Sequence, residues 1–185
     1  MPTRCGLMQL PTRGGTRLWY EVRGEAPAAP VVVFLNAAFA SLRHFDAAAD
    51  LLASHGFRVV TFDHAGVGRS TTSELRCTTR ALAADAVALL DILAPAEPVH
   101  VVGTSLGGCI AQHVALQLRA TGRCRSLFVG FSTKGVYFRS LVAPASPNLW
   151  ALLLRALVLP ADSRLLIPKV WFFGTNRVFH LILMN

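Results

Sequence analysis

The sequence is poor in charge, nearly devoid of lysine and without any cysteine motif. Only 15% of the 185 residues are acidic or basic, and arginines placed singly along the chain supply almost all of the net charge of +8. Because no basic run alternates with aromatic residues, nucleic-acid binding is not predicted. The four cysteines have neither C-x-x-C spacing nor a dense framework, so no metal site and no disulfide scaffold is predicted, and we expect reduced thiols.

Uninterrupted hydrophobic runs of membrane-spanning length are also absent, although hydrophobic residues make up 53% of the chain and the mean hydropathy is +0.47. Residues 149–159 are too few and include Arg155, and residues 165–184 include Pro168, Lys169 and Arg177. A spanning helix needs about 20 nearly uncharged apolar residues, so no span is predicted. The N-terminus lacks the apolar core of a signal peptide. We expect a cytoplasmic location, with a mitochondrial one open because of the early arginines.

Short apolar runs alternate with helical patterns through the first two thirds of the chain. Strands are predicted at 18–22, 31–35, 58–62, 99–102 and 127–131, and helices at 41–55, 79–93 and 108–116. Ser41 is the predicted N-cap of the first helix, and Gly56 the residue that ends it. The alternation predicts an α/β fold with a mostly parallel, doubly wound sheet in residues 1–133. Leucine-rich and aromatic segments broken by prolines predict a partial helical cap in residues 134–185.

The strongest local signal is the segment Gly103-Thr104-Ser105-Leu106-Gly107, which fits the G-x-S-x-G pattern of a nucleophile elbow. In such an elbow the serine sits on a sharp turn from a strand into a helix, and its hydroxyl projects into a site. A β-branched run precedes the segment and a helix-prone run follows it, as the pattern requires. Ser105 is therefore the candidate nucleophile, with Gly103 and Gly107 as structural residues of the turn.

Two further loops follow predicted strands. In the first, Asn36-Ala37-Ala38-Phe39, a backbone N–H can face an oxyanion together with the N–H of Leu106. The second begins at Asp63 and contains Gly66 and Gly68. It lacks the third glycine and the immediate helix of a dinucleotide-binding loop, so a shaped turn beside the active site is the preferred interpretation.

Together these motifs resemble the N-terminal two thirds of an α/β-hydrolase, over about Thr16 to Thr133. The loop that starts at Asn36 is similar to that of 3-oxoadipate enol-lactonase-like members, whereas most relatives carry His-Gly where this chain has Asn36-Ala37. The resemblance implies Ala38 and Leu106 as the oxyanion hole. Asp63, Gly66 and Gly68 match the family turn D-x-x-G-x-G-x-S, although its usual arginine is here Ala65.

The catalytic base and acid expected after the nucleophile are the missing part of the pattern. The family order is serine, acid, histidine, and the chain carries only Asp162, His113 and His180 after Ser105. His113 falls within the elbow helix, so Asp162 and His180 are the weak remaining candidates, and His64 is a further one before the serine. The chain is therefore expected to be truncated at its C-terminus relative to the family.

The resemblance implies a hydrolase that uses a serine to attack an ester, thioester or lactone carbonyl of a small molecule, without metal or organic cofactor. Serine in place of aspartate at the elbow argues against epoxide hydrolase and dehalogenase chemistry. The alternatives are a catalytically incomplete remnant that binds a ligand or partner, and a protein whose apolar, arginine-bearing C-terminus lies on a membrane surface. The sequence does not indicate an oligomeric state or a particular substrate.

Overall fold

The fold is built around one twisted sheet. The computed structural model describes residues 2–11, 14–24, 26, 28–74, 77–132 and the backbone of 180–182. The strands are β1 (Arg4–Gln9), β2 (Arg17–Arg23), β3 (Val31–Leu35), β4 (Arg58–Phe62), β5 (Val99–Thr104), β6 (Cys124–Gly130) and β7 (His180–Ile182). The helices are the 3₁₀ turn η1 (Leu42–Phe45), α1 (Asp46–Ser54), α2 (Thr79–Leu93) and α3 (Leu106–Ala120).

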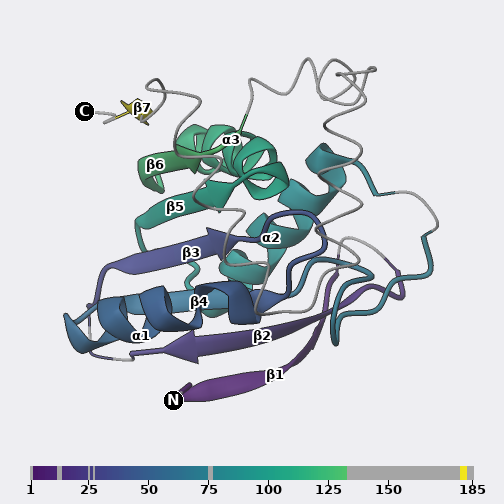
Figure 1. The fold of residues 1–185 in the computed structure, drawn as a ribbon, viewed down its shortest axis with the longest axis horizontal. Coiled ribbons are helices and arrows are strands. Elements are labelled where there is room, and N and C mark those ends of the chain that lie inside the picture. Colours follow the sequence, from purple (N-terminus) through teal and green to yellow (C-terminus); the bar gives the residue numbers. More distant parts are fainter. Residues whose placement is uncertain are drawn as a thin grey trace, which may run out of the picture. The chain divides into compact units, whose positions relative to one another are not determined.

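The strands lie in the order β1-β2-β4-β3-β5-β6-β7 (Figure 1). The four central strands are parallel, whereas β1 and β2 form an antiparallel pair and β2 is antiparallel to β4. The strand β7 is antiparallel to β6, with His180 opposite Val129. The mostly parallel α/β sheet predicted from the sequence is confirmed, and the antiparallel pair at one edge adds to it.

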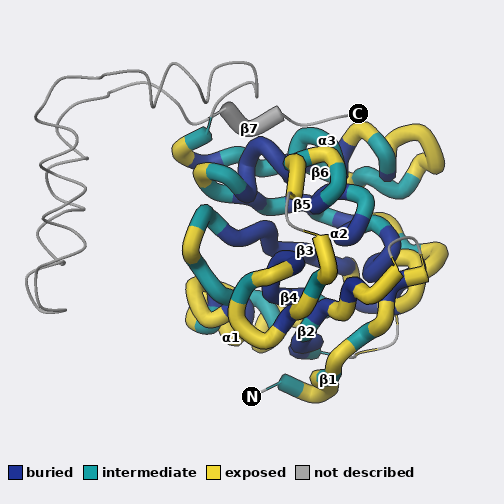
Figure 2. The backbone as a smooth tube through the Cα atoms, turned by 90° about the vertical axis from the view of Figure 1, so that its right-hand side faces the viewer, coloured by how far each residue is buried: buried dark blue, intermediate teal, exposed yellow. Residues whose placement is uncertain are grey.

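Both faces of β3 are covered, which explains why this strand is apolar at every position. Neighbouring side chains of a strand point to opposite faces. Val31, Val33 and Leu35 accordingly join the larger core cluster, which contains residues of α2 and α3, while Val32 and Phe34 join a smaller one with Phe45 and Ala49 of the η1–α1 segment. Figure 2 shows the buried stretches of β3 and β4 in dark blue.

Several element boundaries agree closely with the sequence pattern, whereas α3 and β6 begin earlier than predicted and the first predicted helix is divided. The bounds of β3, β4 and α2 are those predicted, and Gly56 has a positive φ of 85° directly beyond the end of α1. The predicted helix at 41–55 is instead a 3₁₀ turn followed by the shorter α1, and the Ser41 side chain makes no capping hydrogen bond. Thr78, which was not among the predicted caps, caps α2 by accepting the N–H of Ala81 at 3.1 Å.

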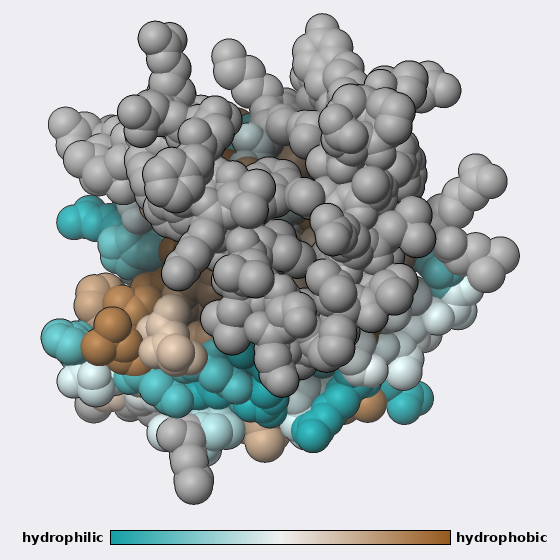
Figure 3. All heavy atoms as spheres, viewed as in Figure 1, coloured by the Kyte–Doolittle hydropathy of each residue, from teal (hydrophilic) through white to brown (hydrophobic). Residues whose placement is uncertain are grey.

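The face in Figure 3 carries both kinds of described side chain, with hydrophilic residues in its lower part beside an apolar patch at the left. None of the described helices combines the length and the hydropathy that crossing a bilayer requires. The predicted cap, residues 134–185, lies outside the described residues except for β7.

Candidate active site

Ser105 occupies the corner between β5 and α3. Its φ of 53° and ψ of −121° are unusual for a residue with a side chain, and α3 begins at the next residue, Leu106. Such backbone strain is of order 1–3 kcal/mol and is concentrated at functional sites. The residue is exposed, and no described side chain hydrogen-bonds its hydroxyl. The structure therefore places this hydroxyl on a tight corner at the carboxyl end of a central strand.

The glycines around Ser105 allow close packing of α3 on the sheet. A Cβ on Gly107 would lie within 3.0 Å of the carbonyl oxygens of Leu35 and Asn36, and one on Gly103 would meet the carbonyl of Gly107 equally closely. Real Cβ atoms essentially never approach backbone atoms so closely. The absence of these side chains brings the first turn of α3 against the end of β3, and so beside the loop that begins at Asn36.

Strand β6 holds the elbow from the other side. The N–H of Ser105 donates to the carbonyl of Gly130 at 2.9 Å, and the hydroxyl of Ser132 donates to the carbonyl of Ser105 at 2.7 Å. A Cβ on Gly108 would also clash with the Ser132 side chain. Sequence reasoning missed Ser132, because no motif marks a serine that meets the elbow only through the pairing of β5 with β6.

Ala38 lies in a turn directly after β3, on the loop that the resemblance assigned to the oxyanion hole. The turn closes through the N–H of Ala40, which donates to the carbonyl of Ala37 at 3.2 Å. The amides of Ala38 and Leu106 donate no hydrogen bond to another described residue. Leu106 is the first residue of α3, where an N–H has no partner inside the helix. Since Leu35 pairs with Gly103 in the sheet, the two loops leave from neighbouring strand ends.

Hydrogen bonds of the Asn36 and His64 side chains link the carboxyl ends of β3 and β4. The Asn36 amide donates to the carbonyl of Phe62 at 2.6 Å, and the Nε2 of His64 lies 3.3 Å from the carbonyl of Asn36. Burial lowers the pKa of His64 to about 4, while the Asn36 carbonyl and the charge of Asp63 act in the opposite direction. His64 is therefore neutral near pH 7. Because it is buried and bonded to this backbone carbonyl, it supports the loop rather than serving as a base.

Asp63 organises the turn after β4. It is buried, and its two carboxylate oxygens accept the N–H groups of Leu42 at 2.8 Å and Arg69 at 3.0 Å. Gly66 and Gly68 have φ values of 77° and 56°, and a Cβ on Gly68 would clash with the Asp63 carboxylate. The predicted structural turn thus links the residues after β4 to the start of η1.

The candidate bases lie in different places. His113 is within α3, eight residues after the serine, which corresponds to about 12 Å along a helix axis. His180 is in β7 opposite Val129, next to the residue whose carbonyl accepts the N–H of Ser105. Asp162 lies outside the described residues. Within the described part of the chain, no three residues of the metal-ligating types come together.

The sequence of this chain matches a known protein family. The family model for the alpha/beta hydrolase fold matches residues 30–130, just over half of the chain, and the chain is a member of that family. Among curated proteins, the chain is 33% identical over 119 residues to rhodomycin D methylesterase DauP of Streptomyces sp. (strain C5), a match that covers 63% of this chain and 38% of the relative.

Solved structures with the same fold include hydrolases with different reactions. An esterase from Thermogutta terrifontis has a TM-score of 0.61 at 23% identity, over 71% of this chain and 46% of that one. The epoxide hydrolase VrEH1 from Vigna radiata has a TM-score of 0.59 at 23% identity, over 68% of this chain and 39% of that one. The chain therefore spans less than half the length of these proteins. The narrower likeness to enol-lactonase-like members stays a prediction.

Proposed function

We propose that the site is that of a serine hydrolase that cleaves an ester, thioester or lactone of a small molecule. The observation that carries the proposal is the exposed Ser105 hydroxyl on a strained corner, together with the backbone amides of Leu106 and of Ala38 on the neighbouring loop, which donate to no described residue. The similarity to a methylesterase favours an ester as the substrate. Serine at this corner, in place of aspartate, disfavours the epoxide chemistry of some structural neighbours.

In the proposed reaction the Ser105 oxygen attacks the carbonyl carbon and its proton passes to a base. The carbonyl oxygen becomes an oxyanion, which the N–H groups of Ala38 and Leu106 stabilise by about 3 kcal/mol each. When the intermediate collapses, the bond to the alkoxide or thiolate breaks, and this group takes the proton back from the base; in a lactone it stays attached to the acyl chain. Water, deprotonated by the same base, then releases the acid and restores the hydroxyl.

His180 is the candidate base that the structure favours over His113. The pairing of β7 with β6 brings its backbone next to the strand end that holds the elbow, whereas His113 lies two turns along α3. A serine without a base is a weak nucleophile. No described side chain hydrogen-bonds the Ser105 hydroxyl, and this observation favours the second candidate function, a binding module that retains the fold without turnover.

Labelling with a fluorophosphonate probe tests the proposal, because the probe reacts only with an activated serine. The wild type should be labelled, Ser105→Ala should not be, and Ser54→Ala should behave as wild type because Ser54 is an exposed serine of α1. Labelling that persists in Ser105→Ala, or its absence from folded wild type, would exclude the nucleophile. The second of these outcomes would leave the binding module.

The same labelling experiment also tests whether His180 is the base. His180→Ala should slow labelling about 100-fold, the lower range for loss of a general base, while His113→Ala should leave the rate unchanged. If His180→Ala is labelled at the wild-type rate while Ser105→Ala is not labelled, His180 is not the base, and Ser105 remains the proposed nucleophile.

A further inference from the structure

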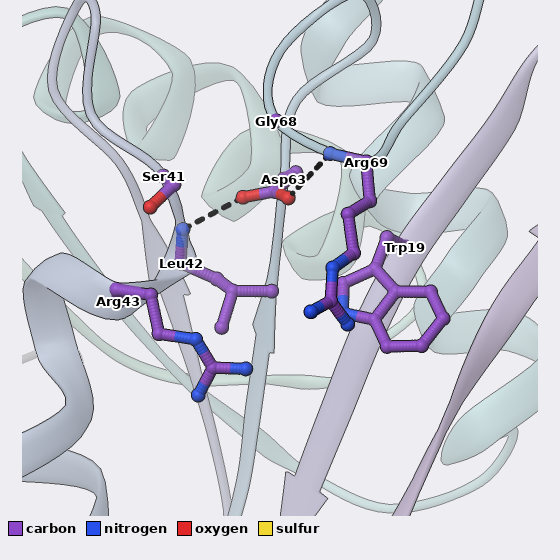
Figure 4. A pocket seen from close by; sticks show the side chains of 7 residues that line it. All are labelled: Trp19, Ser41, Leu42, Arg43, Asp63, Gly68 and Arg69. Atoms are coloured by element: carbon purple, nitrogen blue, oxygen red, sulfur yellow. Dashed lines mark hydrogen bonds between the residues drawn. The ribbon is translucent and has the colours of Figure 1, made fainter.

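A cavity of about 200 Å³ lies beside the Asp63 turn and outside the proposed catalytic residues. Its lining comes from β2, from the start of η1 and from the turn after β4 (Figure 4), and consists of Trp19, Ser41, Leu42, Arg43, Asp63, Gly68 and Arg69. A water molecule takes roughly 30 Å³ in the liquid, so the cavity has room for a small ligand rather than a single water.

The polar side-chain groups of this lining that have no hydrogen-bond partner among the described residues can act as donors. The indole Nε1–H of Trp19 is buried without a partner, and buried polar groups without a partner are rare in native proteins. The Ser41 hydroxyl makes no capping hydrogen bond. Both carboxylate oxygens of Asp63 already accept backbone N–H groups, as the dashed lines in Figure 4 show.

Arg69 is the arginine of the cavity that no described acid pairs with. Its guanidinium carbon lies 4.6 Å from the centre of the Trp19 ring, so the group rests over the indole. A guanidinium held over an aromatic ring keeps its N–H groups for a planar or tetrahedral oxyanion, which it binds through two bonds at once. Arg43, on the opposite side of the cavity in Figure 4, is paired with Glu21 and Asp46.

The charge of the lining also favours an anion. Two arginines and one aspartate line the cavity, but Arg43 is paired with Glu21 and Asp46, and the aspartate accepts two backbone N–H groups. Among the described lining residues, the charge that is left without an opposite partner is the Arg69 guanidinium, which attracts an anion and repels a cation. A neutral apolar ligand would leave the Trp19 N–H without a partner, which costs about 1–3 kcal/mol for a buried donor.

We propose that Arg69, Trp19 and Ser41 form a binding site for a small oxyanion, either a carboxylate or a phosphate group. The site is distinct from the elbow, since neither Ser105 nor Ala38 lines it. Its bound anion bridges the turn after β4 and the residues that follow the oxyanion loop. Occupancy therefore stabilises the connection that Asp63 already makes between these two segments.

Titration of the full chain with sodium phosphate and with sodium acetate tests the site, with sodium chloride at equal ionic strength as the reference. The readout is the ¹⁵N–¹H signal of the Trp19 indole, assigned with Trp19→Phe. A saturable shift is expected in the wild type and in Arg80→Ala, which removes an exposed arginine of α2. Arg69→Ala should weaken binding at least about tenfold, the ratio that corresponds to 1.4 kcal/mol, and Arg69→Lys should retain part of it.

The two anions identify which source of oxyanion the site prefers, and either saturable response supports it. Equal affinity in Arg69→Ala, or a shift that chloride reproduces, would overturn the proposal. Retained dispersion of the other amide signals in Arg69→Ala shows that the variant is folded. The readout is independent of hydrolysis, so failure of the serine hydrolase proposal leaves this result unaffected, and the reverse also holds.

Discussion

Two turns at the carboxyl edge of the sheet each place a polar side chain directly after a parallel strand, and they use it in opposite ways. Asp63, after β4, is buried and accepts two backbone N–H groups. Ser105, after β5, is exposed, and its side chain bonds to no described residue. The first side chain is committed to holding loops together, whereas the second remains available for a reaction.

The backbone shows the same contrast. In the turn after β4, the residues with a positive φ are Gly66 and Gly68, where this conformation costs little free energy. In the elbow, Ser105 itself has a positive φ, and the neighbouring glycines allow α3 to approach the sheet closely. Strain is thus avoided in the structural turn and accepted at the residue proposed to react.

The largest expected difference between the two turns is in stability. Asp63→Ala leaves the N–H groups of Leu42 and Arg69 without an acceptor, and at about 2 kcal/mol for each donor the free energy of unfolding should fall by about 4 kcal/mol. Ser105→Ala removes an exposed hydroxyl and should change it by less than about 0.5 kcal/mol. Urea denaturation of both variants measures the difference. Equal losses would show that the two side chains are not used differently.

A smaller effect is expected from the pH dependence of His64, which lies beside Asp63. Its pKa is near 6.5 in the unfolded chain and about 4 in the folded one. The unfolded state therefore binds more protons between these values, so the stability that neutral His64 provides is complete above pH 6.5 and is lost as the pH falls toward 4. The loss should amount to about 3 kcal/mol.

The matched variant for this measurement is His64→Gln, which keeps a donor for the carbonyl of Asn36 but does not titrate. Its free energy of unfolding should fall less steeply over the same pH range. Burial also lowers the pKa of His100, so part of the dependence will remain. An identical slope in wild type and His64→Gln would show that His64 does not carry the effect.

The smallest expected change is a gain in stability at the elbow. Ser105→Gly relieves the positive φ and should raise the free energy of unfolding by about 1 kcal/mol, while it abolishes probe labelling. The same substitution at Ser54, within α1, should lower it by about 0.5–1 kcal/mol. Denaturation of the two variants side by side checks this. A loss of stability at both positions would contradict the strain assigned to Ser105.

Much of the fold and the position of the elbow follow from local patterns. The β-branched, apolar segment 31–35 and the periodic segment 79–93 have the predicted bounds because each pattern depends on burial within one element. Ser41 was predicted to cap the helix at 41–55, whereas the N–H of Leu42 at the start of this segment donates to Asp63, which is distant in sequence. Local pattern carries no information on such a bond.

The sequence by itself determined the family, the α/β order of the elements and a serine flanked by glycines, since these depend on spacing along the chain. Only the tertiary structure decided that Ser132 and Gly130 hold the elbow, that His64 is buried and neutral, and that Arg69 rests on Trp19 in a cavity of donors. Each of these contacts joins residues that are distant along the chain, and hydrogen bonding and desolvation depend on distances in space that no local pattern specifies.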